Sequence, residues 1–167
     1  MNVIYYSYLD SPRGPILLRG DGQFVTGLFF RHHKYGPELQ TDWQHSDTTF
    51  AEVREQLTQY FAGERQTFDV PLRLAGTPFQ QRVWQELTRI PYGETISYGQ
   101  LAQRIGRPTA TRAVGAANGR NPISIVTPCH RVIGSSGKLT GFAGGLATKA
   151  FLLRLEGAVA APIKTAA

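Results

Sequence analysis

The sequence predicts an α/β N-terminal domain over residues 1–75 and a mostly α-helical C-terminal domain over residues 76–167. Short apolar segments separated by turn residues fill the first part, whereas apolar residues recur at helical spacing in the second. Gly76 lies between the two patterns and is the expected boundary. With 167 residues, 41% of them hydrophobic, the chain is long and apolar enough to bury a core.

Strands are expected first along the chain. Residues 3–6 are a strand candidate, and the Pro- and Gly-containing run at residues 11–15 is a turn. Residues 16–18 and 24–30 are expected to pair as a hairpin across Asp21-Gly22, because Asp-Gly supplies the positive φ that such a turn needs.

One helix is expected in the N-terminal domain, after a polar loop at residues 31–47. Thr49 and Glu52 form a capping-box pattern at its start. Apolar residues recur at helical spacing behind it: Phe50, Val53, Leu57, Tyr60 and Phe61. A short extended segment at residues 68–74 completes the domain.

The C-terminal domain opens with a helix that has signals at both ends. Thr77 and Gln80 form a capping box around Pro78, which is suited to the first helical position. The apolar side of this helix contains Phe79, Val83, Trp84, Leu87 and Ile90. The run Pro91-Tyr92-Gly93 ends it.

Two further short helices are expected in this basic region. Ser97 and Gln100 cap the first, which ends at Gly106 and has Tyr98, Leu101, Ala102 and Ile105 on its apolar face. The second opens at Pro108-Thr109 and closes at Asn118-Gly119, with contact positions at Ala110, Ala113, Val114 and Ala117. The pair is typical of a helix-turn-helix, although two ordinary packed helices would give the same pattern.

The second helix of this pair carries mostly small residues around Arg112. Such a helix can approach another surface closely, and one long cation can then reach into a groove.

The charge of the chain is +6 and is unevenly distributed. Residues 1–75 hold seven Lys/Arg and nine Asp/Glu, whereas residues 76–167 hold eleven Lys/Arg and only three Asp/Glu. A basic imbalance confined to one half favours a polyanionic partner, with nucleic acid first. No membrane-length apolar run or signal pattern is present, so we expect a cytoplasmic protein without membrane contact.

Cys129 is the only cysteine, in the run Thr127-Pro128-Cys129-His130-Arg131-Val132. An internal disulfide is therefore excluded. Neighbouring positive charge or a base favours the thiolate, which is the nucleophilic form. The alternative is that Cys129 is a small buried hydrophobe, as most free cysteines are.

From residue 79 to residue 157 the chain resembles the O6-alkylguanine-DNA alkyltransferases, which repair DNA by direct reversal. The motifs that carry the resemblance occur in the family's order and spacing: residues 91–98, residues 112–115, Asn121-Pro122, residues 128–132 and residues 141–145. The N-terminal half matches loosely, through the turn at residues 10–14. The resemblance implies a ribonuclease-H-like shape for that half.

The resemblance implies irreversible transfer of an alkyl group from O6-alkylguanine in DNA, and also from O4-alkylthymine, to Cys129. His130 would act as its base through a water, and Glu156 would orient His130. Asn121 matches a residue that holds this network, and Tyr98 matches a hydrogen-bond donor to the purine. The thioether product is permanent, so each molecule would act once.

The resemblance also implies binding of double-stranded DNA through its minor groove by a protein that is monomeric when free. Arg112 matches the residue that fills the stack when the damaged nucleotide is rotated out. The groove would be lined by Thr111, Ala113 and Gly115. The pocket for the base would be formed by Val132, Phe142, Ala143 and Gly144. Some members carry tyrosine and serine in place of Phe142 and Ala143, so a hydroxyl donor to O6 is missing here.

We expect no cofactor and no metal site. The N-terminal half has no cysteine with which to hold a structural zinc, and His32, His33 and His45 are expected in surface loops. Two other functions remain open on the residues alone: a binding-only protein for alkylated DNA, and a cysteine hydrolase. In the binding-only alkyltransferase-like proteins tryptophan replaces the cysteine, so Cys129 argues against the first.

Overall fold

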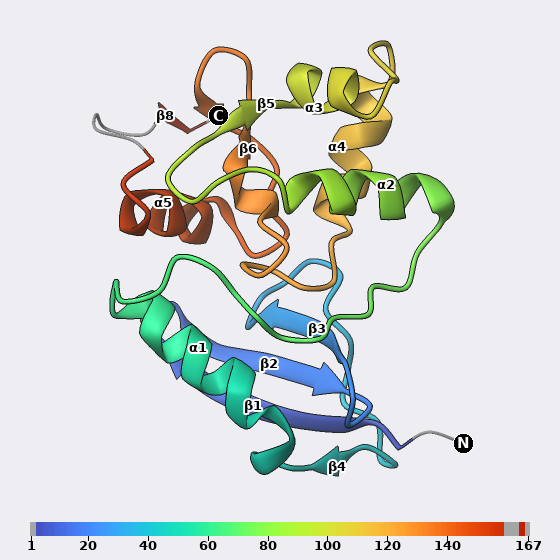
Figure 1. Cartoon of the computed structure of the whole chain (residues 1–167), viewed down its shortest axis with the longest axis vertical. Helices are drawn as coiled ribbons and strands as arrows, with labels where there is room; N and C mark the ends of the chain where they lie inside the picture. Colours follow the sequence, from blue (N-terminus) through green and yellow to red (C-terminus); the bar gives the residue numbers. More distant parts are fainter. Residues whose placement is uncertain (1–2, 159–163, 166–167) are drawn as a thin grey trace.

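A computed structural model describes residues 3–158 and 164–165. At one end of the molecule a four-stranded sheet in the order β3-β2-β1-β4 lies against helix α1, and the remaining helices gather at the other end (Figure 1). The strands are β1 (Tyr5–Ser11), β2 (Gly14–Gly20), β3 (Val25–Phe30) and β4 (Gln44–His45). Neighbouring strands are antiparallel except β1 and β4, which are parallel. The expected hairpin is therefore present, between β2 and β3.

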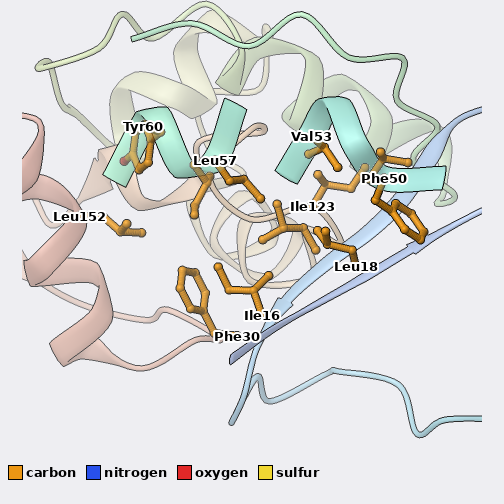
Figure 2. Close-up of a cluster of buried hydrophobic side chains, with 12 residues drawn as sticks. Ile16, Leu18, Phe30, Phe50, Val53, Leu57, Tyr60, Ile123 and Leu152 are labelled. Atoms are coloured by element: carbon orange, nitrogen blue, oxygen red, sulfur yellow. The ribbon is translucent and has the colours of Figure 1, made fainter. Parts of the chain in front are cut away.

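Helix α1 (Ala51–Phe61) buries one side against the sheet. Figure 2 shows Val53, Leu57 and Tyr60 of α1 pointing toward the core that Ile16 and Leu18 of β2 enter from the sheet. The three helical residues follow the 3.6-residue period and the two strand residues follow the period of two. Both periods therefore converge on one core, as the sequence predicts.

Residues of the C-terminal part complete this core. Ile123, Ile125 and Leu152 belong to the same buried cluster. The backbone of Leu28 in β3 accepts from Ser124 N at 3.1 Å and donates to Pro122 O at 2.9 Å, so residues 122–124 continue the sheet beside β3. The two parts of the chain consequently share a core rather than meeting across a separate surface.

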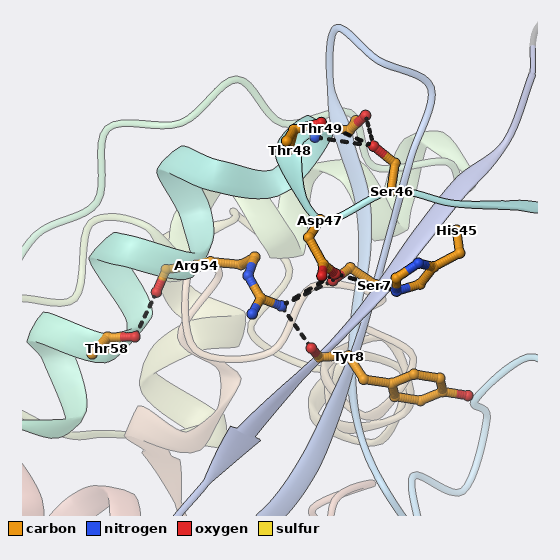
Figure 3. Close-up of polar contacts among 9 residues, drawn as sticks. All are labelled: Ser7, Tyr8, His45, Ser46, Asp47, Thr48, Thr49, Arg54 and Thr58. Atoms are coloured by element: carbon orange, nitrogen blue, oxygen red, sulfur yellow. Dashed lines mark hydrogen bonds and ion pairs between the residues drawn. The ribbon is translucent and has the colours of Figure 1, made fainter.

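A polar network fixes α1 on β1 (Figure 3). Arg54 of α1 donates to Ser7 Oγ at 2.9 Å and to the Tyr8 carbonyl at 2.6 Å. Ser7 is fully buried and donates to Asp47 Oδ1 at 2.6 Å. Because a buried hydroxyl without a partner would be costly, this network explains how a serine is accommodated in the interior of the strand.

Three local predictions for this part are wrong. The first strand spans residues 5–11 rather than 3–6, and β4 lies within the predicted loop at residues 31–47. The Thr49–Glu52 capping box does not form, because a 3₁₀ turn, η1 (Thr48–Phe50), precedes α1. The Thr49 N–H instead donates to Ser46 Oγ at 3.2 Å (Figure 3).

The described residues of the C-terminal part contain four α-helices and two short strand pairs. The helices are α2 (Pro78–Leu87), α3 (Tyr98–Arg104), α4 (Thr111–Gly119) and α5 (Leu146–Leu155). The strands are β5 (Ile96–Ser97), β6 (Val132–Ile133), β7 (Lys138–Leu139) and β8 (Lys164–Thr165). β5 pairs with β6 and β7 pairs with β8, both in parallel. Among the described residues, none of the helices combines the length and apolar character needed to cross a bilayer.

Both capping boxes predicted for this part are confirmed. Gln80 N donates to Thr77 Oγ1 at 3.1 Å, and Thr77 N donates back to Gln80 Oε1 at 3.0 Å. Ser97 and Gln100 exchange the same two bonds at 3.1 and 2.8 Å. Each reciprocal pair satisfies two backbone donors that a helix start leaves unpaired.

Helix α4 differs from its prediction. It begins at Thr111, after Ala110, and no side chain caps it. Val114 and Ala117 are buried as expected, but Ala113 is exposed and is not a contact position. Trp84 on α2 donates its ring N–H to the Ala117 carbonyl at 2.8 Å, which anchors the buried side of α4.

The expected boundary residue, Gly76, has a packing reason to be glycine. A Cβ there would lie 2.5 Å from Cη2 of Trp84. The chain therefore passes directly over the indole ring as it enters the second part.

Candidate active site

Cys129 opens a short 3₁₀ turn, η2 (Cys129–Arg131), directly before β6. Only 5% of its surface is exposed, and Tyr98 and Phe142 pack against the buried cluster that contains it. Its carbonyl accepts from Asn118 Nδ2 at 3.3 Å. The sulfur is therefore held in a fixed, nearly enclosed position.

Asn121 shapes the loop that leads to Cys129. Its side chain accepts from Ile123 N at 3.0 Å and donates to the carbonyls of Ile123 and Thr127 at 3.2 and 2.7 Å. Within this loop Ile125 has a φ of +70°. A β-branched residue rarely adopts that conformation, so the loop stores strain that the Asn121 bonds and the shared core must hold.

The thiol of Cys129 is not ionised by its surroundings alone. Burial raises its pKa above the ordinary value, while the polar side chain of Asn121 and the positive charge of Lys149 act in the opposite direction. A reaction through the thiolate consequently needs a nearby acceptor for the proton.

His130 follows directly and belongs to a buried cluster around Glu156. His130 Nε2 lies 2.7 Å from Glu156 Oε2, and neither side chain has exposed surface. Arg131 donates from Nε to Glu156 Oε1 at 2.8 Å and from Nη2 to Oε2 at 3.1 Å. Tyr60, from α1, donates its hydroxyl to Oε2 at 2.6 Å. The carboxylate is thus surrounded by donors.

These contacts fix the protonation states of the cluster. Burial alone would raise the pKa of Glu156, but the hydrogen bonds from His130 and Arg131 outweigh it and lower the pKa to about 2. Burial lowers the pKa of His130, against the opposing effect of Glu156. A neutral histidine facing an ionised carboxylate must donate from Nε2, so Nδ1 carries the lone pair.

That free nitrogen, His130 Nδ1, is one of four buried side-chain polar atoms without a hydrogen-bond partner among the described residues, together with Asn118 Oδ1, Ser124 Oγ and Thr127 Oγ1. Cys129 lies between Thr127 and His130 in the chain. Buried polar atoms without partners next to a cysteine in the chain are typical of a site that takes up a ligand or a proton relay.

Lys149 on α5 is a buried cation whose charge acts on Cys129, and the sequence prediction missed it. Its side chain is fully buried, and Nζ donates to the carbonyls of Val132 and Thr140 at 2.6 and 2.8 Å. Burial lowers its pKa to about 8, while Cys129 acts to raise it. One sequence signal could have indicated it: Lys149 lies at helical spacing between Leu146 and Leu153, on a face that is otherwise apolar.

Tyr98, at the start of α3, turns its hydroxyl toward the loop at residues 140–145. It donates to the Thr140 carbonyl at 2.9 Å and lies 3.4 Å from Lys149 Nζ. Burial raises the pKa of Tyr98, so the hydroxyl stays protonated. Tyr98 and Lys149 therefore place two proton donors on the same loop carbonyl.

Two cavities flank this loop. One, of about 330 Å³, is lined by Tyr98, Thr111, Arg112, Gly115, Thr140 and Gly141. The other, of about 500 Å³, runs between the loop, the later part of α4 and Lys34-Tyr35 of the N-terminal part. Lys34 N donates to the Ala143 carbonyl at 2.8 Å, so the N-terminal part contacts the loop directly.

The predicted pocket residues separate in the structure. Phe142 and Ala143 line the larger cavity, whereas Val132 is fully buried beneath the Lys149 ammonium. At Gly144 a Cβ would lie 2.7 Å from the Phe142 ring, so this glycine lets the loop pack closely. Thr111, Arg112 and Ala113 are exposed on α4, and Gly115 is half-buried.

No group of three or more metal-binding side chains occurs among the described residues. Of the three histidines expected in surface loops, His32 is exposed in one. His33 lies in the same loop but is half-buried, where it packs edge-on against Phe29, and burial lowers its pKa to about 4. His45 lies in β4, where Nε2 is 3.2 Å from Asp47.

Two family models match the chain. Residues 4–74 match the ribonuclease-like domain, and residues 78–158 the DNA-binding domain, of 6-O-methylguanine DNA methyltransferase. The chain is 53% identical to the methylated-DNA–protein-cysteine methyltransferase of Methanosarcina acetivorans over 154 residues, which cover 92% of this chain and 99% of that protein. Its counterpart from Mycobacterium tuberculosis is 54% identical over 92% of this chain and 93% of that protein.

Solved structures show the same similarity. The crystal structure of Mycobacterium tuberculosis OGT in complex with DNA superposes with a TM-score of 0.86 at 52% identity, covering 92% of each chain. The O6-methylguanine-DNA methyltransferase of the archaeon Pyrococcus kodakaraensis superposes with a TM-score of 0.63 at 27% identity, covering 93% of this chain and 99% of that one.

Proposed function

Because the chain belongs to the 6-O-methylguanine DNA methyltransferase family, we propose that Cys129 accepts the alkyl group when this protein repairs DNA. The protein is a methylated-DNA–protein-cysteine methyltransferase that binds DNA and removes the alkyl group from O6-alkylguanine in a single turnover. The observation that carries the assignment of Cys129 is its place in the chain directly before His130, which forms a buried pair with Glu156.

The reaction is a displacement at a saturated carbon. The thiolate attacks the alkyl carbon, a sulfur–carbon bond forms, and the bond from that carbon to guanine O6 breaks. The electron pair of that bond stays on the guanine, which then takes up a proton. The thioether left on Cys129 is not cleaved by water or thiols, so the protein acts as a stoichiometric acceptor.

His130 is the proposed acceptor of the thiol proton. Its Nδ1 carries the free lone pair, and a water between the sulfur and Nδ1 would complete the transfer. The ionised Glu156 fixes the imidazole in this tautomer and stabilises the imidazolium that forms. Asn121 supports the strained loop through its bond to the Thr127 carbonyl, and its side chain acts to lower the pKa of the Cys129 thiol, which favours the thiolate.

Tyr98 and Lys149 are the proposed donors for the developing charge. The ammonium of Lys149 favours the thiolate before transfer, and its pKa of about 8 lets it give up a proton near neutrality. The Tyr98 hydroxyl is protonated and its oxygen lies 3.4 Å from Lys149 Nζ. If one of these two groups gives its proton to the purine, the other can therefore reprotonate it. A donor aimed at the departing purine lowers the barrier because negative charge develops there.

The damaged base is proposed to enter through the cavities beside the loop at residues 140–145. Phe142 and Ala143 form part of the wall, and the backbone N–H of Ala143 can donate to O6, where a hydroxyl is lacking. Gly144 allows the loop to pack against Phe142, and Val132 supports its floor from the core. The same pocket would take O4-alkylthymine.

Helices α3 and α4 are the proposed helix-turn-helix, in a C-terminal domain beginning at residue 76. Residues 1–75 would form the ribonuclease-H-like domain, in line with the family model for that region. We propose that α4 enters the minor groove with Thr111, Ala113 and Gly115 along it, since small side chains permit close approach. The protein would act on the chromosome in the cytoplasm and be monomeric when free.

Arg112 is the residue that would occupy the stack vacated by the everted nucleotide. It is exposed at the start of α4 and lines the 330 Å³ cavity. Without that filler, eversion costs a few kcal/mol more. We expect the Arg112→Ala variant to repair duplex DNA roughly 10²-fold more slowly than the wild type. It should react with free O6-benzylguanine at the wild-type rate. Single-turnover kinetics on both substrates measures the difference.

Arg154→Ala is the matched control, because it removes an exposed cation from the same half of the chain on another helix. It should change repair little. Equal losses on duplex and free base in Arg112→Ala would contradict the role of Arg112.

Intact-mass spectrometry tests the function itself. Duplex DNA that contains one O6-methylguanine should add a single methyl mass to the protein, and peptide mapping should find it on Cys129. A binding-only protein would bind the duplex without any mass change. A cysteine hydrolase would release many product molecules per protein and keep its original mass. Either result would refute the proposal.

A further inference from the structure

Tyr60 links the N-terminal part to the buried cluster beside Cys129. It lies near the end of α1, fully buried, with its ring against those of Phe68 and Tyr92 at 5.6 and 6.3 Å between centroids. Figure 2 shows Tyr60 at the end of the shared core where Leu152 of α5 enters. Its hydroxyl reaches Glu156, 96 positions further along the chain, at 2.6 Å.

The oxygen that Tyr60 contacts is also the one that holds His130. Glu156 Oε2 accepts from Tyr60 at 2.6 Å and from His130 Nε2 at 2.7 Å, with Arg131 Nη2 at 3.1 Å. The other oxygen, Oε1, accepts from Arg131 Nε. Two short donors on one carboxylate oxygen compete for the same electron density, so a change in one alters the strength of the other.

We propose that Tyr60 is a positioning residue for alkyl transfer, whose hydroxyl shares the Glu156 carboxylate with His130 and thereby keeps the imidazole neutral and able to accept the Cys129 proton. This inference rests on the proposed function. By donating to Oε2, Tyr60 weakens the pull of that oxygen on the Nε2 proton. A carboxylate without this competitor would hold the imidazolium more firmly, and His130 would be a base only at higher pH.

The other groups that act on His130 come from η2 and from α5 with its C-terminal capping residue. Arg131 beside it in η2 and Lys149 of α5 disfavour a second positive charge, whereas Glu156 at the end of α5 favours it. Cys129 precedes it in the chain. Tyr92 contacts the Tyr60 ring, but its hydroxyl lies 3.3 Å from the Leu155 carbonyl. Within the described residues, Tyr60 is therefore the only N-terminal group that hydrogen-bonds the carboxylate.

If Tyr60 had only a packing role, Tyr60→Phe would leave the pH dependence of alkyl transfer unchanged. Phenylalanine keeps the ring and its contacts with Phe68 and Tyr92, and removes only the donor to Glu156. Loss of packing alone would lower the melting temperature without changing the pH at which the protein becomes active. The pH dependence of transfer consequently separates the two roles.

We expect Tyr60→Phe to move the acid limb of the single-turnover rate upward by about one pH unit, since the hydrogen bond it removes acts on the ionised partner of His130. Tyr92→Phe is the matched control, because it removes a neighbouring hydroxyl that does not reach the carboxylate. Its profile should match the wild type. If the profile of Tyr60→Phe, measured on folded protein, superimposes on that of the wild type, the proposal is wrong.

A second measurement is independent of transfer. In ¹⁵N-histidine NMR of the DNA-free protein, His130 should titrate at higher pH in Tyr60→Phe than in the wild type. This result stands even if the wild type fails to take up a methyl group, so failure of the proposed function is distinguishable from failure of this inference. An unchanged His130 titration would refute the role of Tyr60.

A variant with 4-aminophenylalanine at position 60 keeps the inference testable if Tyr60→Phe does not fold. Its amine fills the same space and remains a donor, but a weaker one. We expect the acid limb of its rate profile to lie between those of the wild type and Tyr60→Phe. If Tyr60→Phe does not fold, the acid limb of the 4-aminophenylalanine variant should still lie at higher pH than that of the wild type. A wild-type profile from this weaker donor would contradict the proposal.

Discussion

Cys129→Ser is expected to abolish alkyl transfer while the protein still binds DNA. Serine places an oxygen where the sulfur lies, but its hydroxyl is far less acidic than a thiol, and His130 cannot deprotonate it to a useful extent. Loss of a nucleophile typically lowers a rate by about 10⁴-fold or more. Intact mass after prolonged incubation with an O6-methylguanine duplex should therefore show unmodified protein.

Binding should survive because the proposed contacts with DNA lie elsewhere. Thr111, Arg112 and Ala113 are exposed on α4, whereas Cys129 is 5% exposed in the core below. Fluorescence anisotropy with the same duplex should give an affinity close to that of the wild type, and thermal unfolding should show that the variant is folded. If the Cys129→Ser protein still gained a methyl group, the alkyl acceptor would not be the Cys129 thiol, and the mechanism would be wrong.

Local signals predicted part of this structure well. The capping boxes at Thr77 and Ser97 depend on a side chain and a backbone group three residues apart, so the sequence contains all the information needed. The same pattern failed at Thr49 because Ser46 takes its backbone N–H and a 3₁₀ turn precedes the helix. A local rule thus holds only where no neighbouring residue competes for the donor.

The environment of Cys129 depends on contacts that no local pattern reveals. The adjacent Arg131 looked like the cation that would activate the thiol, yet its guanidinium is committed to Glu156 and to the Ile90 carbonyl. The cation that acts on the sulfur is Lys149, on α5. The sequence left open whether Cys129 is buried; the structure shows that it is, and burial raises the pKa of the thiol and makes a base necessary.

The N-terminal contribution was the hardest to foresee. Tyr60 fits the apolar period of α1, so the pattern assigns it to the core, and it does lie there. Nothing in that period indicates a partner for its hydroxyl 96 positions away. The shared core explains the pairing: once Ile123 and Leu152 pack under α1, the end of α5 and Glu156 come within reach of Tyr60.

Glu156→Gln is expected to lower both alkyl transfer and stability. The amide cannot neutralise Arg131, and it has one acceptor oxygen for donors that now share two. Breaking a buried ion pair by removing one partner costs about 3–5 kcal/mol. His130 would also lose the ionised group that fixes its tautomer, so we expect transfer to fall by roughly 10²-fold. Urea unfolding and single-turnover kinetics measure the two effects.

The stability effect should depend on pH in a defined direction. Glu156 has a folded pKa of about 2, below its ordinary 4.5, so its stabilising contribution is complete above about pH 4.5 and is lost as the pH falls toward 2. A shift of that size corresponds to roughly 3 kcal/mol. The difference in free energy of unfolding between the wild type and Glu156→Gln should therefore be constant from pH 7 to 5 and shrink below pH 5.

Glu86→Gln is the control. The partner of Glu86, Arg89, lies largely in solvent, so loss of this ion pair should cost at most about 1 kcal/mol. A difference for Glu156→Gln that stays constant down to pH 2.5 would mean that the carboxylate is not held by His130 and Arg131 as the geometry requires.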